Sequence, residues 1–82
     1  MKKSVDFALD DHPADDERPR TAWAVAIADD CDGCEDLRVE ISLEEFGRAG
    51  TGVAAHLAAS SARRLRGALA AALRDLGEDP GP

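Results

Sequence analysis

The chain has 82 residues, 33% of them charged, and a formal net charge of −7. This length allows one domain at most, and the acidic balance disfavours nucleic-acid binding, which depends on Lys and Arg releasing counterions from phosphates. No stretch approaches the roughly 20 apolar residues of a membrane-spanning helix, and acids rather than an apolar run follow the basic start, unlike a secretory signal. We therefore expect a cytoplasmic protein without a membrane partner.

The first predicted element is a short strand over residues 4–9, where large apolar residues alternate with smaller or polar ones. A floppy N-terminus is the alternative interpretation of this segment. Residues 10–20 contain two prolines and dense charge, which is typical of a mobile linker. Residues 1–20 are therefore predicted to be an N-terminal segment, with a short strand followed by an acidic linker.

The second predicted strand, residues 21–28, alternates strictly between larger residues and alanines, and neither of its faces carries a charge. We expect such a strand at the centre of a sheet, or with its alanine face covered by another element or a second copy. Small side chains would let a partner approach closely, so this face is a candidate interaction surface. Its members are Ala22, Ala24 and Ala26.

The third predicted strand, residues 37–43, has four large aliphatic residues on one face and Arg38, Glu40 and Ser42 on the other. An acidic turn with the dipeptide Asp-Gly separates it from the second strand, so the two are predicted to form a β-hairpin. Residues 44–56 contain three glycines and are predicted to form a flexible crossing loop.

An amphipathic helix is predicted over residues 58–76, where leucines recur at helical spacing among alanines and arginines. Gly77 is the expected stop of this helix. The sequence therefore predicts an α+β fold, in which a small antiparallel sheet of two or three strands is packed by one C-terminal helix. We assign residues 21–77 to this ββα domain and residues 78–82 to a disordered tail.

The predicted core is thin for a lone domain. Small domains without disulfides often gain stability by associating. We therefore expect a homodimer or a larger homo-oligomer.

Two cysteines, Cys31 and Cys34, form a Cys-Asp-Gly-Cys sequence in the predicted turn, as in sites that present two thiolates to zinc. Tetrahedral zinc needs four ligands, which His56 and His12 could complete, or a second copy with its own two cysteines. Alternatively the cysteines are incidental or form a disulfide, and His56 bonds to nearby loop backbone at the entry to the helix. A redox site is disfavoured because the surrounding acids oppose formation of a thiolate. A calcium loop would lack its first and last ligands.

A basic cluster, Arg63, Arg64 and Arg66, lies in the first turns of the predicted helix. Positive charge is unfavourable at this end of a helix dipole, so we expect acidic partners for these side chains, with DNA contact as the alternative. The sequence contains no recognisable catalytic triad order and no glycine-rich phosphate loop. One helix also leaves little room for a closed pocket, and we expect no enzymatic activity.

Over about residues 21–76, the chain resembles small actinomycete regulatory proteins of the BldB type. The resemblance rests on Val-x-Ile strands followed by Thr51-Gly-Val-Ala-Ala-His56-Leu57 and then by Ser61-Ala-Arg-Arg-Leu-Arg-Gly-Ala-Leu-Ala-Ala-Ala-Leu73. It implies a homodimeric or higher-order regulatory protein without catalysis, whose partners are itself or another regulatory protein. A zinc-binding module and a DNA-contacting regulator are the competing hypotheses.

Overall fold

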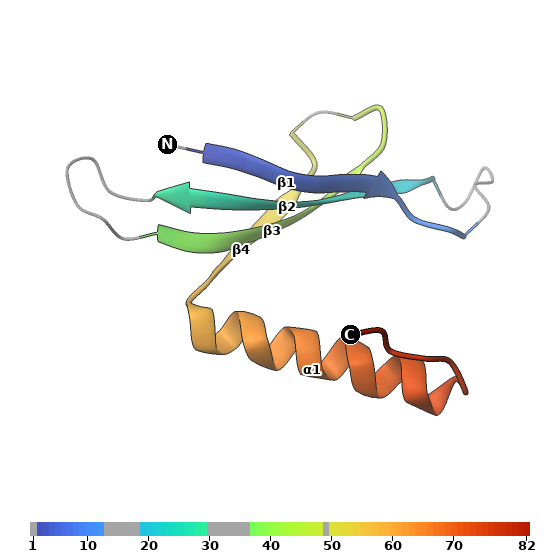
Figure 1. Cartoon of the computed structure of the whole chain (residues 1–82). Coiled ribbons are helices and arrows are strands. Elements are labelled where there is room, and N and C mark those ends of the chain that lie inside the picture. Colours follow the sequence, from blue (N-terminus) through green and yellow to red (C-terminus); the bar gives the residue numbers. More distant parts are fainter. Residues whose placement is uncertain (1, 13–18, 30–36, 49) are drawn as a thin grey trace.

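The structure, a computed structural model, describes residues 2–12, 19–29, 37–48 and 50–82. These residues form one four-stranded antiparallel sheet in the order β1-β2-β3-β4, followed by a helix, α1 (Figure 1). The elements are β1 (Lys2–Leu9), β2 (Thr21–Asp29), β3 (Leu37–Glu45), β4 (Val53–Leu57) and α1 (Ala59–Asp75). The predicted α+β class is confirmed, with four strands in place of the two or three expected.

The uncharged strand β2 lies inside the sheet, between β1 and β3, as its two uncharged faces predict. β1 pairs with β2 from Lys2 to Leu9, with a register shift between Ser4 and Asp6. The pairing continues past the end of β1, because the Asp10 N–H donates to the Thr21 carbonyl at 2.8 Å. The N-terminal strand is therefore part of the same sheet as the hairpin.

β4 lies in the segment that was expected to be a loop. It pairs with β3 without a break, from Leu57 opposite Val39 to Val53 opposite Leu43. Two of its five residues are alanines, which have little intrinsic preference for strands. Pairing with β3 supplies the stabilisation that the local sequence lacks, and this explains why β4 was missed.

The register of the strands separates an apolar face of the sheet from an alanine face, because residues opposite each other in an antiparallel pair share a face. On the apolar face, Trp23, Val25 and Ile27 of β2 lie opposite Leu43, Ile41 and Val39 of β3. The complete apolar face of β2, β3 and β4 comprises Trp23, Val25, Ile27, Leu37, Val39, Ile41, Leu43, Val53, Ala55 and Leu57. The larger residues of β2 and the aliphatic residues of β3, each predicted to share one face of its strand, thus lie side by side in the sheet.

Helix α1 follows β4 directly and runs along one side of the sheet (Figure 1). Its predicted extent agrees with the observed one to within a residue at each end. The expected glycine stop is present: Gly77 has a φ of 81°. Its N–H donates to the Arg74 carbonyl at 2.9 Å and the Glu78 N–H donates to the Leu73 carbonyl at 2.9 Å, which is the Schellman arrangement.

The described part of the chain has a very small buried core. Its buried hydrophobic residues are Ala26 and Ala28, which are 4% and 7% exposed, and no large side chain in that part is fully buried. The accessible surface of the chain is 6544 Å², whereas a folded monomer of 8.7 kDa has about 4,700 Å². The Cα radius of gyration is 14.9 Å, against about 12 Å for a compact domain of this length. The single chain is therefore unusually open.

Gly52, at the entry to β4, provides a test of how closely β4 approaches β3. A Cβ at this position would lie 2.9 Å from the Leu43 carbonyl oxygen and 3.1 Å from the Glu44 Cβ. We expect Gly52→Ala to lower the free energy of unfolding by about 1–2 kcal/mol, since the backbone must shift to relieve the contact. Urea unfolding measures this change. The matched control is Gly67→Ala in α1, where nothing lies within 4 Å of a Cβ and we expect a gain of up to about 1 kcal/mol. Equal effects of the two substitutions would contradict the close approach.

Candidate interaction surface

Large apolar side chains remain exposed on the apolar face and along α1. Val53 and Leu43, at the same end of the sheet, are 70% and 49% exposed, and Leu69 of α1 is 60% exposed. Other exposed members of this surface are Leu37, Leu65, Leu73 and Leu76. Exposed apolar side chains on the sheet and on α1 make both parts of the chain candidates for an interaction site.

A groove of about 450 Å³ shows where α1 meets the sheet. Ile41 comes from β3, Ala55 and Leu57 come from β4, and the helix supplies Ser61, Arg64, Leu65 and Ala68. α1 therefore lies on the side of the apolar face, opposite β3 and β4. The groove between helix and sheet is not filled by the chain's own side chains.

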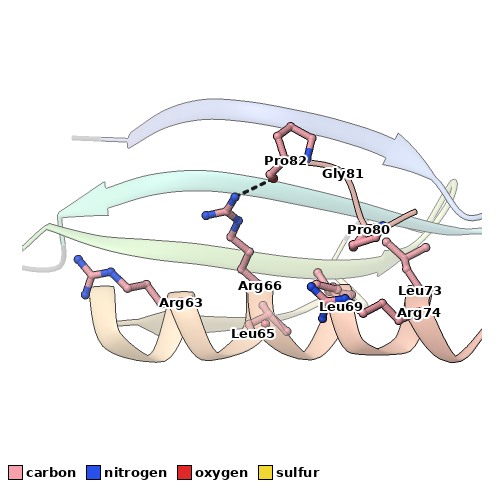
Figure 2. A pocket seen from close by; sticks show the side chains of 11 residues that line it. Arg63, Leu65, Arg66, Leu69, Leu73, Arg74, Pro80, Gly81 and Pro82 are labelled. Atoms are coloured by element: carbon pink, nitrogen blue, oxygen red, sulfur yellow. Dashed lines mark hydrogen bonds between the residues drawn. The ribbon is translucent and has the colours of Figure 1, made fainter. Parts of the chain in front are cut away.

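A second hollow, of about 580 Å³, lies between α1 and the last residues of the chain, which return along the helix (Figure 2). The Arg66 Nη2 donates a hydrogen bond to the Pro82 carbonyl oxygen at 2.9 Å. Arg63 and Arg74 also line this hollow, together with Leu69 and Leu73 among others. The residues predicted to form a disordered tail are thus placed against the helix.

The predicted basic cluster is divided by the fold. Arg63 and Arg66 line the hollow beneath the C-terminal residues, whereas Arg64 lines the groove between α1 and the sheet. All three side chains are exposed. The cluster therefore faces two different surfaces, and DNA contact through it remains a prediction.

The predicted alanine surface is on the opposite side of the sheet from α1. Ala22 and Ala24 are half-buried and Ala26 is buried. Register places them beside Glu44, Ser42 and Glu40 of β3. The alanines and the arginines, both predicted as interaction residues, therefore do not form one continuous surface.

A small charged group lies on the alanine face around Glu40. The Lys2 Nζ donates to the Glu40 Oε1 at 3.3 Å, and the His56 Nε2 lies 4.0 Å from the same oxygen. The Glu40 side chain is 12% exposed, against 64% for Lys2. β4 thus places His56 opposite Glu40 on the neighbouring strand, where sequence reasoning had placed it at the entry to the helix.

The predicted zinc ligands Cys31 and Cys34 lie outside the residues that the structure describes. Within residues 2–12, 19–29, 37–48 and 50–82, no group of three or more His, Cys, Asp or Glu side chains is arranged to hold a metal ion. Zinc binding stays a prediction from the sequence.

β4, the last strand of the described sheet, is the part of this surface that the sequence did not predict. All its residues except Leu57 are exposed. The only local signal was a weak alternation, with Val53, Ala55 and Leu57 on one side and Ala54 and His56 on the other. Five residues with two central alanines are too short a pattern to separate from the preceding glycine-rich loop.

Comparison with known proteins gives no match: no family model, no curated protein and no solved structure is significantly similar to this chain. Among the described residues, the helix is too short and too polar to cross a membrane.

Proposed function

We propose that the protein is a small non-catalytic interaction protein that works as a homodimer and has a regulatory role. The observation that carries this proposal is the exposed apolar surface of the sheet and α1. Val53 and Leu69 are more than half exposed in the single chain. A second copy that covers this surface would provide the core that one chain lacks.

The size of the exposed area supports association. The accessible surface of 6544 Å² exceeds the value expected for a compact monomer by about 1,800 Å². A stable protein–protein interface of standard size removes about 800 Å² from each partner. The excess is therefore large enough for a full interface.

The regulatory part of the proposal rests on the resemblance to BldB-type proteins, whose partners would be a second copy or another regulatory protein. The absence of catalysis rests on the sequence, which lacks a recognisable catalytic motif. The fold adds the kind of contact that such a protein would make, since a half-covered sheet and helix are suited to binding another folded chain.

The mass in solution tests the proposal. We expect light scattering coupled to size-exclusion chromatography to give twice the chain mass of 8.7 kDa at micromolar concentration. Dilution should lower the melting temperature, because a dimer is stabilised by its own concentration. A folded monomer whose melting temperature does not depend on concentration would contradict the proposal.

A further inference from the structure

We infer that two copies pair through β4, with the β4 edge of one chain running antiparallel to the β4 edge of the other. Two four-stranded sheets would thereby join into one sheet of eight strands. This inference rests on the proposed homodimer and names its interface. It follows from a comparison of the two edges of the sheet, from the register of β4 and from the position of α1.

The β1 edge carries features that oppose pairing with another strand. Lys2 and Lys3 place charge at its start, and the register shift between Ser4 and Asp6 interrupts its regular ladder. The Asp6 Oδ1 also accepts a hydrogen bond from the Phe7 N–H at 2.8 Å, which occupies a backbone donor. Natural sheets use charge and bulges of this kind to protect exposed edges.

The β4 edge differs in its sequence and in its register. Its sequence, Val-Ala-Ala-His-Leu, contains no Lys, Arg, Asp, Glu or Pro, and its pairing with β3 has no register shift. The first residue of the strand, Val53, is 70% exposed. A regular, uncharged edge with exposed apolar side chains is suited to pairing with a further strand.

The length of β4 selects one register for symmetrical pairing. Ala55 is the middle of the five residues, so the two strands pair over their full length only when Ala55 lies opposite Ala55 of the second copy. Val53 then lies opposite Leu57 of the second copy, and Ala54 opposite its His56. Each of these pairs joins residues of the same face, so the apolar faces of the two sheets become continuous.

The position of α1 is compatible with this pairing. Strands lie about 4.8 Å apart, so the two-fold axis would pass about 2.4 Å from β4 and about 7 Å from β3. Across the groove, α1 faces Ile41 of β3 and Ala55 and Leu57 of β4. A helix centred over the two strands would lie about 5 Å from the axis, and the two helices would then be about 10 Å apart, close to the usual 8–10 Å for packed helices. Leu57 of the second copy would lie opposite Val53 of the first copy. The α1 helix of the second copy would therefore begin beside Val53 and Leu43 of the first copy.

A charge on the β4 edge tests the interface. We expect Val53→Lys to raise the Kd of the dimer by about tenfold or more, because two lysines would be buried without partners in each dimer. The control is Val5→Lys on β1, since Val5 is 60% exposed and Val53 is 70% exposed. Sedimentation equilibrium measures the Kd, and circular dichroism checks that both variants fold. We expect Val5→Lys to leave the Kd unchanged.

A cysteine at the two-fold axis tests the register and does not depend on weakening the fold. In a Cys31→Ser, Cys34→Ser background, we expect Ala55→Cys to form a disulfide-linked dimer on oxidation. Residues opposite each other in antiparallel strands have Cα atoms about 4.5–5.5 Å apart, within the range that a disulfide spans. Val5→Cys in the same background should stay unlinked at equal concentration.

The outcomes separate this inference from the proposed function. A wild-type dimer that Val53→Lys does not weaken, or that Ala55→Cys does not link, uses another surface, so the inference fails while the homodimer stands. A wild-type monomer overturns both.

Discussion

We expect Leu69→Glu to raise the Kd of the homodimer by about a thousandfold. Leu69 lies on α1 and is 60% exposed in the single chain, so a glutamate there should cost the isolated chain little. In the proposed dimer a second copy covers the side chain, and burying a leucine contributes about 2 kcal/mol. A symmetrical dimer loses this contribution twice, which together gives about 4 kcal/mol, or about a thousandfold in Kd.

Phe7→Glu is the matched control for this prediction. Phe7 is also 60% exposed, but register places it opposite Ala24 on the alanine face. Light scattering across a dilution series compares the two variants with the wild type. If Leu69→Glu remained dimeric at the lowest measurable concentration, or if both substitutions weakened the dimer equally, the association would not involve α1 and the apolar face.

The second large effect is expected at the centre of the apolar face. Ile41 lies opposite Val25 on one side and Ala55 on the other, and it lines the groove beneath α1. We expect Ile41→Ala to lower the free energy of unfolding by about 2–3 kcal/mol, because it removes packing between sheet and helix. Domains have only about 5–15 kcal/mol of stability in total, so this change should produce a large shift in the unfolding midpoint.

Ser42→Ala is the control for Ile41→Ala. Ser42 is the next residue along β3 and faces the opposite side of the sheet, beside Ala24 and Ala54. Its removal should change the free energy of unfolding by less than about 0.5 kcal/mol. Urea unfolding can be followed through the fluorescence of Trp23, the single tryptophan. A loss at Ile41 no larger than that at Ser42 would show that the apolar face is not packed.

The sequence predicted the elements whose own pattern determines them. Strict alternation in β2 and β3 predicted which residues share a face, and leucines at helical spacing predicted α1, because each pattern is contained within one segment. β4 was missed because the stability of Val53–Leu57 comes from β3, which lies in another segment. The residues that surround the alanine face could not be predicted either. Glu40 and Lys2 are brought near these alanines by neighbouring strands, which the pattern of β2 does not record.

The candidate surface was predictable only in outline. The thin predicted core indicated self-association, but the sequence favoured the alanines of β2 as the interaction surface. Val53 and Leu43 are exposed on the other face, where α1 meets β3 and β4. How far a helix covers a sheet depends on the path of the chain after its last strand, and periodicity carries no information about that path.

The register shift in β1 has a consequence for the size of the assembly. A sheet with two open edges can add copies at both ends and grow into a fibre. Here the shift between Ser4 and Asp6 and the bond from the Phe7 N–H to Asp6 make β1 unsuitable for further addition. Pairing at β4 uses the same edge of both copies, so each dimer would present a β1 edge at both of its ends. Assembly would then stop at two chains. β1, which is the outer strand of each sheet, would protect the dimer from polymerisation.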